Sequence, residues 1–411
     1  MTGLLAAERA RLAQPRIGGA TADERNQALE MIAEALDDRS AEILAANQAD
    51  VAGAAHLPPP MVARLRLDPR GLSATVAGVR AVAALPDVLG QVLAAWDRPN
   101  GLRIRRVRVP LGVVGIIYEA RPGVTVEAAA LCLKAGNAVI LKGGSEAART
   151  NAALGEAVAA GLRRAGLPPD LAAVLPSTRE AGAELMAATG LVDVLIPRGG
   201  AGLIKAVVAE SRVPVIETGT GVCHVYVHAG ADLAMAGAII INAKCQNPAV
   251  CNAAETMLVD RSVADSFLPR ASEALRAAGV TLRGCPRTRA ILPWAEPATD
   301  DDWEAEYLDL TLAVQVVDGL DEALAHIARY GTKHSEAIIT ADGKAAARFL
   351  AEVDAAAVYH NASTRFTDGG EFGFGAEIGI STQKLHARGP MGLADLTSHK
   401  YIIEGNGQVR G

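Results

Sequence analysis

The chain has 411 residues, of which 50% are hydrophobic but only 3% aromatic, and its formal net charge is −6. This length predicts two domains, and a core of small aliphatic residues is typical of parallel sheets covered by helices. An acidic chain without a basic face or run is not expected to bind nucleic acid. No stretch approaches the ~20 apolar residues of a membrane span, and no signal peptide is recognisable, so we expect no membrane association.

The five cysteines are odd in number and lack the spacing of disulfide frameworks or metal sites. They are Cys132, Cys223, Cys245, Cys251 and Cys285. We therefore expect a reducing compartment, a cytoplasmic location and no bound metal.

The first hundred residues read as helices. Thr21 and Glu24 form a capping box, after which Leu29, Ile32 and Leu36 fall on one helical face. Further helices are predicted at residues 40–51, 61–67 and 72–85. Residues 103–110 alternate basic and apolar side chains, which suits an exposed strand or hairpin arm.

From residue 113 the pattern alternates between strand and helix, which predicts a doubly wound parallel sheet with ligands at the carboxyl ends of its strands. Strands are expected at residues 113–118, 138–142, 172–175, 192–196 and 213–216, and helices at 122–135, 146–165, 180–189 and 200–209. A second α/β unit runs from about residue 231 to 358, and residues 401–403 read as a late strand. The expected division is 1–228 for a cofactor domain with an arm at 101–110, 229–360 for a catalytic domain, and 361–411 for a return segment and a last strand.

Three loops that follow predicted strands could bind a ligand. Lys142, Gly143, Gly144 and Ser145 lie between a strand and a helix, where peptide N–H groups favour an anion, although an ordinary turn explains them equally well. Arg198, Gly199 and Gly200 occupy a similar place and are open to the same two explanations. Glu217 closes the apolar run 213–216, and on the residues alone a solvated glutamate is the simpler interpretation.

Cys251 lies in a polar loop that runs directly into an apolar strand pattern. A lone intracellular cysteine is usually structural. Cys132 reads as a core residue, Cys223 and Cys285 have no polar constellation around them in the sequence, and Cys245, between Lys244 and Gln246, is the rival nucleophile.

Several motifs occur in an order that resembles the aldehyde dehydrogenase superfamily and, within it, the gamma-glutamyl phosphate reductases. They are Leu133-Lys-Ala-Gly-Asn-Ala-Val-Ile-Leu-Lys142, Glu217-Thr-Gly-Thr-Gly221, Cys251-Asn-Ala-Ala-Glu-Thr256 and Leu385-His-Ala-Arg-Gly-Pro-Met-Gly-Leu393. The resemblance covers nearly the whole chain. It implies an aldehyde dehydrogenase-like fold of two doubly wound domains with a small oligomerisation arm, and it makes Cys251 the nucleophile.

The same resemblance implies roles for the other candidates. Lys142 would hold the adenosine ribose or its 2′-phosphate, and because Ser145 replaces an acidic residue, NADP(H) is the expected cofactor. The loop of Arg198, Gly199 and Gly200 would run beside the pyrophosphate, and Glu306 would contact the nicotinamide ribose. Glu217 matches the glutamate that many members of the superfamily use as a general base for hydrolysis. If phosphate rather than water releases the acyl group, no such base is needed.

The implied reaction is reduction of L-glutamyl 5-phosphate to L-glutamate 5-semialdehyde through a thioester on Cys251, the second step of proline biosynthesis. Candidate cations for the substrate are Arg121, Lys333, His334 and Arg365. The superfamily's usual oxyanion asparagine is replaced by Ala120, which leaves the backbone N–H of Cys251, with Asn252, to stabilise the oxygen. A homo-oligomer is expected through the arm and the last strand, and glutamate 5-kinase is a candidate partner.

Three alternatives remain at this point. A non-phosphorylating aldehyde dehydrogenase would turn over without phosphate. A thiol acyltransferase or hydrolase would have no redox step and would not need the sequence around Lys142. A binding protein on the same fold would have an ordinary thiol at Cys251.

Overall fold

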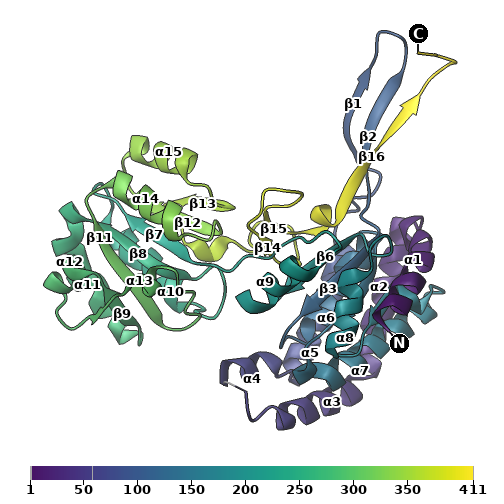
Figure 1. Cartoon of the computed structure of the whole chain (residues 1–411), viewed down its shortest axis with the longest axis horizontal. Helices are drawn as coiled ribbons and strands as arrows, with labels where there is room; N and C mark the ends of the chain where they lie inside the picture. Colours follow the sequence, from purple (N-terminus) through teal and green to yellow (C-terminus); the bar gives the residue numbers. More distant parts are fainter. Residues whose placement is uncertain (1, 58, 411) are drawn as a thin grey trace. The chain divides into compact units, whose positions relative to one another are not determined.

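The computed structural model describes residues 2–57 and 59–410, which form two compact units. Unit 1 comprises Met1–Thr218, Gly373–Gly379 and Met391–Gly411, and unit 2 comprises Gly219–Phe372 and Ile380–Pro390 (Figure 1). The division falls at Thr218 and Gly219, ten residues before the boundary expected at 228. The C-terminal part of the chain alternates between the units.

Unit 1 begins with helices. They are α1 (Gly3–Gly18), α2 (Ala22–Asp38), α3 (Ser40–Gly53), α4 (Pro59–Leu65) and α5 (Pro69–Ala84). The capping box predicted at Thr21 and Glu24 is present at the start of α2, and Leu29, Ile32 and Leu36 are all buried. The amphipathic pattern therefore fixes which face of α2 packs against the rest of the unit.

A parallel sheet follows, in the strand order β5-β4-β3-β6. Its strands are β3 (Val113–Tyr118), β4 (Ala138–Lys142), β5 (Ala172–Val174) and β6 (Val194–Arg198), and its helices are α6 (Gly123–Lys134), α7 (Ala148–Arg164), α8 (Arg179–Ala187) and α9 (Ala201–Glu210). The strand predicted at 213–216 is wrong: only an isolated bridge joins Val215 to Leu195. Pro214 has no N–H to donate, which limits pairing in this segment.

The remaining strands of unit 1 form an antiparallel sheet in the order β1-β2-β16. These are β1 (Val92–Asp97), β2 (Arg103–Pro110) and β16 (Thr397–Glu404), and they extend away from the helices of unit 1 (Figure 1). The prediction that all of the first hundred residues are helical is wrong at β1, because pairing with β2 overrides the local propensity. The late strand is confirmed, and it pairs with β2 of its own chain.

Unit 2 contains a parallel sheet in the order β10-β9-β11-β8-β7-β12-β13. Its strands are β7 (Cys223–Val227), β8 (Ala254–Asp260), β9 (Thr281–Gly284), β10 (Glu296–Pro297), β11 (Thr311–Val317), β12 (Ser335–Ile339) and β13 (Ala357–His360). The helices are α10 (Leu233–Cys245), α11 (Arg261–Ala277), α12 (Pro286–Ile291), α13 (Asp300–Trp303), α14 (Leu320–Tyr330) and α15 (Gly343–Glu352), and two short strands, β14 (Ile380–Ser381) and β15 (Gly389–Pro390), pair with each other.

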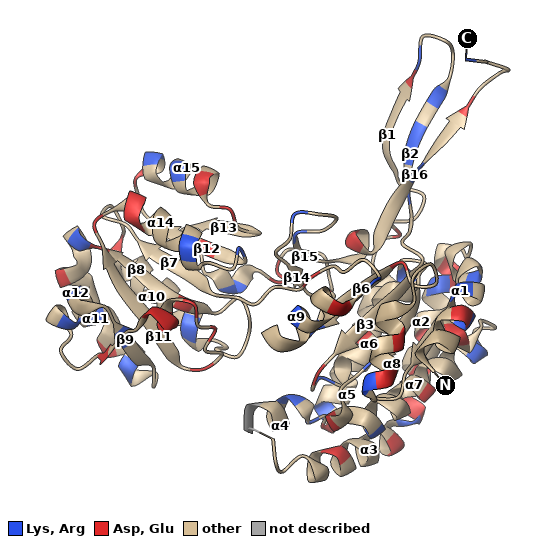
Figure 2. Ribbon diagram, viewed as in Figure 1, with Lys and Arg blue, Asp and Glu red and all other residues tan. Residues whose placement is uncertain are grey.

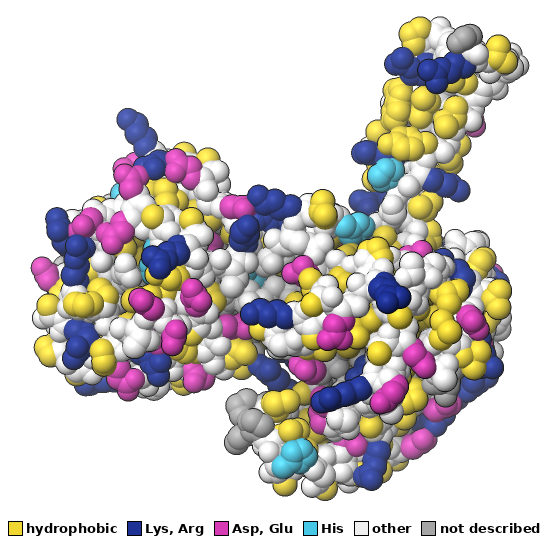
Figure 3. Space-filling model, in the orientation of Figure 1, with side chains coloured by type: hydrophobic (Ala, Val, Ile, Leu, Met, Phe, Trp, Pro, Cys, Tyr) yellow, Lys and Arg dark blue, Asp and Glu magenta, His cyan; other side chains and the backbone are white. Residues whose placement is uncertain are grey.

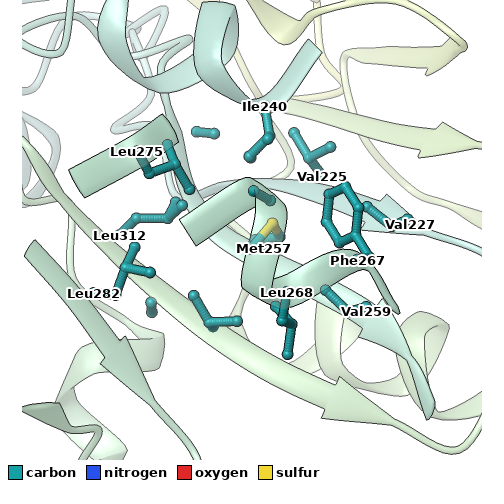
Figure 4. Close-up of a cluster of buried hydrophobic side chains, with 14 of the residues drawn as sticks. Val225, Val227, Ile240, Met257, Val259, Phe267, Leu268, Leu275, Leu282 and Leu312 are labelled. Carbon is teal, nitrogen blue, oxygen red and sulfur yellow. The ribbon is translucent and has the colours of Figure 1, made fainter. Parts of the chain in front are cut away.

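Aliphatic side chains fill the core of unit 2, as the composition predicts. Val225, Met257 and Leu312 from the strands pack with Ile240 from α10 and Phe267 from α11 (Figure 4). Strands this fully buried read as continuous apolar runs, so any polar side chain within them invites a specific explanation.

Candidate active site

Unit 1 gathers three loops at the carboxyl end of its parallel sheet. Residue Ile117 of β3 pairs with Lys142 of β4, and Tyr118 pairs with Arg198 of β6. The loops that begin at Lys142, Glu119 and Arg198 therefore leave three adjacent strands side by side, as expected for a ligand site in a doubly wound sheet.

Lys142 is half-buried, and burial lowers the pKa of its ammonium group, while the carboxylates of Glu146 and Glu119 act in the opposite direction. A cation that is partly desolvated in this way interacts strongly with an incoming anion. Ser145, three residues later, is exposed at the start of a 3-10 turn.

The glycines of these loops are needed for close approach. A Cβ atom on Gly143 would collide with the Asn151 amide, and one on Gly199 would lie 2.5 Å from Glu119 Oε2. The N–H of Gly200, at the N-terminus of α9, donates to the same Glu119 oxygen at 3.0 Å. Peptide N–H groups at a helix N-terminus, glycines beside them and a half-buried lysine two strands away fit the phosphates and ribose of a nicotinamide nucleotide.

Unit 2 places Cys251 at the opposite end of its own sheet, just before β8. The thiol belongs to a half-buried turn. Gly221, just before β7, lies against this turn so closely that any Cβ atom there would overlap the Cys251 carbonyl. Glycine at position 221 is therefore a packing requirement of the cysteine loop.

The other thiols have different surroundings. Cys132 is completely buried in α6 and burial raises its pKa, whereas Cys245 is half-buried and its pKa is also raised by burial. The expectation that Cys223 and Cys285 lack polar neighbours is wrong. Cys223 Sγ donates to the Cys251 carbonyl at 3.2 Å and lies 3.7 Å from His334 Nδ1, and Cys285 Sγ accepts from the Thr288 N–H at the start of α12. The pairing of β7 with β8 and β12, which a linear sequence does not display, creates the Cys223 contacts, whereas Cys285 contacts Thr288 locally as the N-cap of α12.

Asn252 joins the cysteine loop to residues 364–367. Its Nδ2 donates to the Thr367 carbonyl at 2.8 Å, its own carbonyl accepts from Thr364 Oγ1 at 2.7 Å, and its Oδ1 accepts from the Arg365 guanidinium. Arg365 also donates to Gln246 Oε1 at 2.8 Å. The Asn252 side-chain nitrogen thus donates to main-chain carbonyls. Arg365 is held by the side-chain oxygen of Asn252, the residue that follows Cys251.

A buried ion pair lies behind the cysteine loop and was missed in the sequence. Lys244 Nζ and Glu255 Oε2 are 2.6 Å apart and both side chains are fully buried. Burial raises the pKa of Glu255 to about 7 in spite of Lys244. The other Glu255 oxygen accepts from the Leu308 N–H, and Glu306 nearby accepts from the Gly221 N–H at 2.7 Å. The sequence signal for this ion pair is Glu255, a carboxylate within the otherwise apolar pattern of β8.

The remaining candidates differ in position and state. Arg121 is exposed in unit 1, and Lys333 is exposed in unit 2, 3.6 Å from Asp354. His334 is fully buried and burial lowers its pKa to about 4, so it is neutral at pH 7. The expectation that His334 supplies a positive charge to the substrate is therefore wrong. Glu217 is half-buried and belongs to unit 1, whereas Cys251 belongs to unit 2.

Ala120, the position at which the resemblance implies that an asparagine is missing, adopts a left-handed backbone conformation with φ of 42°. Its N–H donates to Glu146 Oε1 at 2.6 Å. A non-glycine residue in this region is strained, and such residues concentrate at functional sites.

Two negative findings bound the site. Across residues 2–57 and 59–410, no group of His, Cys, Asp or Glu side chains is arranged to hold a metal ion. None of the helices in this part of the chain has both the length and the apolar character that crossing a bilayer needs.

Comparison with known proteins agrees with this geometry. The model of the aldehyde dehydrogenase family matches residues 4–284. The gamma-glutamyl phosphate reductase of Symbiobacterium thermophilum is 71% identical, and the alignment covers 98% of this chain and 99% of that protein. The corresponding enzyme of Moorella thermoacetica is 60% identical over 98% of this chain and 97% of its own length.

The solved structures lead to the same assignment. The gamma-glutamyl phosphate reductase of Thermotoga maritima superposes with a TM-score of 0.97 at 47% identity, with both chains fully covered. An acetylating aldehyde dehydrogenase from Geobacillus thermoglucosidasius, at 19% identity, shares the fold with a TM-score of 0.69 over 99% of this chain and 97% of its own. The chain belongs to the aldehyde dehydrogenase family and, within it, to the gamma-glutamyl phosphate reductases.

Proposed function

We propose that the chain reduces L-glutamyl 5-phosphate to L-glutamate 5-semialdehyde and phosphate in the cytoplasm, as a step of proline biosynthesis. The observation that carries this proposal is the placement of a basic side chain, Arg365, against Asn252, directly beside Cys251. A nucleophile that must expel phosphate needs a cation near the leaving group.

The chemistry on the protein is acyl transfer to sulfur. The Cys251 thiolate attacks the acyl carbon, the bond to the phosphate oxygen breaks, and a thioester forms while Arg365 neutralises the departing phosphate. Ala120 offers no side-chain donor and the Asn252 amide is engaged elsewhere, so the main-chain N–H of Cys251 is the proposed donor to the tetrahedral oxygen. When bound, the nicotinamide cofactor supplies the hydride that reduces the thioester.

NADP(H) is the proposed form of the cofactor, and Lys142, Gly143, Gly144 and Ser145 are the residues that would distinguish it. Lys142 provides a positive charge and exposed Ser145 a hydroxyl, while the Glu146 carboxylate accepts from the Ala120 N–H. The loop of Arg198, Gly199 and Gly200 would hold the pyrophosphate, and Glu306 the nicotinamide ribose.

Glu217 is proposed to have at most an accessory role. Inorganic phosphate is already an anionic nucleophile, whereas water would need a general base. If release of the acyl group depends on phosphate, the glutamate is dispensable for the main reaction.

A spectrophotometric assay of the reverse reaction tests the proposal. With L-glutamate 5-semialdehyde and NADP⁺, we expect NADPH to form only when inorganic phosphate is present. Steady turnover without phosphate would establish a non-phosphorylating aldehyde dehydrogenase instead. Failure to bind NADPH would favour a thiol acyltransferase or hydrolase.

A homo-oligomer is also proposed, through the sheet β1-β2-β16. Large apolar side chains are exposed on it, including Trp96, Tyr401 and Ile403, and the Trp96 and Tyr401 rings lie edge to face at 6.1 Å (Figure 3). Exposed apolar surface and unpaired strand edges favour association with another chain. Glutamate 5-kinase remains the proposed partner that supplies the acyl phosphate.

Light scattering tests the proposed assembly. Ile403→Arg should lower the measured mass, while Val409→Arg, at an exposed position beyond β16, should not. A wild-type protein that is monomeric at micromolar concentration would contradict the proposal.

A further inference from the structure

Three cationic side chains of unit 2 converge on one carboxylate. Asp354 lies 2.8 Å from Arg388, 3.0 Å from Lys384 and 3.6 Å from Lys333. Arg388 and Lys384 lower the pKa of Asp354 to about 2, so the carboxylate is ionised at neutral pH. One negative charge does not balance three positive ones, so these four residues, the Asp354 cluster, retain an excess of positive charge in an acidic chain.

The Asp354 cluster lies at the same end of the sheet as Cys251. A series of contacts connects them: the Cys251 carbonyl accepts from Cys223 Sγ, and Cys223 Sγ lies 3.7 Å from His334 Nδ1, next to Lys333. The Lys333 carbonyl in turn accepts from the Ala356 N–H at 2.8 Å, two residues after Asp354. The nucleophile and the cluster therefore flank the amino ends of β8, β7, β12 and β13, which are neighbouring strands.

Strained backbone marks this region. Lys333 and His386 have positive φ values of 64° and 65°, which are unfavourable for residues with a side chain. Lys384, His386 and Arg388 all lie in the loop between β14 and β15, where Figure 2 shows basic segments in blue. Conformations of this kind persist where the surrounding structure imposes them, and they concentrate at ligand sites.

The helix dipoles explain why side-chain cations are needed here. Segments that enter the amino ends of parallel strands come from helix C-termini, as α14 does before Lys333 and α15 before Asp354. Helix C-termini carry partial negative charge, which repels an anion. We therefore expect lysine and arginine side chains to bind an anionic substrate group at this end.

We propose that Lys384 and Arg388 bind the α-carboxylate of the substrate and that Asp354 holds the two cations in position. This inference rests on the proposed function. The phosphate is attached to the carbon that Cys251 attacks, so Arg365, beside Asn252, is placed for it. The α-carboxylate is at the other end of the substrate, and the Asp354 cluster lies at the same end of the sheet as Cys251, where Lys333 precedes β12 and Asp354 precedes β13.

Steady-state kinetics with matched variants tests the inference. Lys384→Met and Arg388→Met remove one positive charge each from the cluster, and Lys344→Met removes an exposed charge from α15 of the same unit. The assay is semialdehyde oxidation with NADP⁺ and phosphate. We expect both cluster variants to raise the KM for semialdehyde by about tenfold or more, since a charged hydrogen bond contributes about 1.5–3 kcal/mol. The kcat and the KM values for phosphate and NADP⁺ should stay within about twofold, and Lys344→Met should match the wild type.

Two further measurements separate the possible failures. With 4-aminobutanal, which lacks the α-carboxylate, the cluster variants should equal the wild type. A raised KM for phosphate with an unchanged KM for semialdehyde would assign the cluster to phosphate and overturn the inference. So would cluster variants that behave like Lys344→Met in an active enzyme.

Calorimetry with L-glutamate makes the inference independent of turnover. The wild-type protein should bind L-glutamate more tightly than 4-aminobutyrate, and Lys384→Met should lose this difference. If the wild-type protein proves inactive, this result would still support the carboxylate site, although the proposed reaction would have failed. Equal binding of the two compounds would overturn the inference.

Discussion

The two parallel sheets of this chain present their candidate site residues at opposite ends. In unit 1, Lys142 and Arg198 are the last residues of β4 and β6, at the carboxyl end of the sheet. In unit 2, Cys251 and Lys333 precede β8 and β12, at the amino end. The same α/β architecture therefore serves two different kinds of site.

The difference follows from the direction of the helices. Loops at a carboxyl end lead into helix N-termini, so the peptide N–H groups at Gly200 and the dipole of α9 can bind phosphates. Loops at an amino end come from helix C-termini, so we expect the substrate's negative charges to be met by side chains such as Arg365 and Lys384. The proposed cofactor site combines main-chain N–H groups with Lys142 and Arg198, whereas the proposed substrate site depends on side-chain cations and a thiol.

The largest effect is expected from removing the thiol in unit 2. Cys251→Ser should lower turnover by more than about 10³-fold, because a hydroxyl is a far poorer nucleophile than a thiolate at neutral pH. NADPH binding, which we assign to unit 1, should remain and can be measured by fluorescence titration. Cys245→Ser is the matched control and should keep most activity. An inactive Cys245 variant beside an active Cys251 variant would show that the nucleophile is misassigned.

The next effect concerns the acid stability of unit 2. Burial lowers the pKa of His334 from 6.5 to about 4, so its neutral form stabilises the fold fully above pH 6.5, and this contribution is lost as the pH falls toward 4. The loss is on the order of 3 kcal/mol for a shift of this size. Urea unfolding followed by tryptophan fluorescence, to which Trp303 of unit 2 contributes, measures it.

In His334→Gln the free energy of unfolding should depend less steeply on pH between 6.5 and 4, whatever its absolute value. His399→Gln changes an exposed histidine of unit 1 and should keep the wild-type slope. An identical slope in the His334 variant would mean that this imidazole is not held neutral.

A smaller effect is expected from changing the charge beside the cofactor in unit 1. Ser145→Asp would place a carboxylate against the 2′-phosphate, at a cost of about 1–3 kcal/mol, so the preference for NADPH over NADH should fall about 10- to 100-fold. Ser145→Ala, which removes only the hydroxyl, separates charge from hydrogen bonding. An unchanged ratio of kcat/KM values for the two cofactors in the Asp variant would exclude this loop from cofactor selection.

The smallest effect should come from Glu217→Gln. The variant should retain phosphate-dependent activity within about tenfold, because phosphate needs no general base to attack the thioester. Any slow hydrolysis of the thioester by water should decrease more than the main reaction. A loss as complete as that of Cys251→Ser would show that the carboxylate is essential.

Much of the fold could be predicted because local patterns and tertiary packing agree. The capping box at Thr21 and the apolar runs of β3 and β4 show this, since their bounds or caps are those that the sequence predicts. The prediction failed at β1, whose residues pair with β2 across a turn, and at Val213–Ile216, where Pro214 limits the pairing.

The candidate site was less predictable from the residues alone. The motif at Cys251 is local in sequence, but the partners of Cys223, the burial of His334 and the convergence on Asp354 depend on which strands become neighbours. A histidine reads as a potential cation until its burial is known. The Asp354 cluster joins residues from the loops before β12 and β13 and from the β14–β15 loop, and no sequence spacing indicates that convergence.

A pre-steady-state experiment tests most directly whether Cys251 forms the thioester that phosphate releases. Wild-type protein mixed with L-glutamate 5-semialdehyde and NADP⁺, without phosphate, should produce one burst of NADPH equal to the number of active sites, and added phosphate should restore steady turnover. Cys223→Ser should retain the burst, and Cys251→Ser should lack it. A burst in the Cys251 variant, or steady turnover of the wild type without phosphate, would contradict the account.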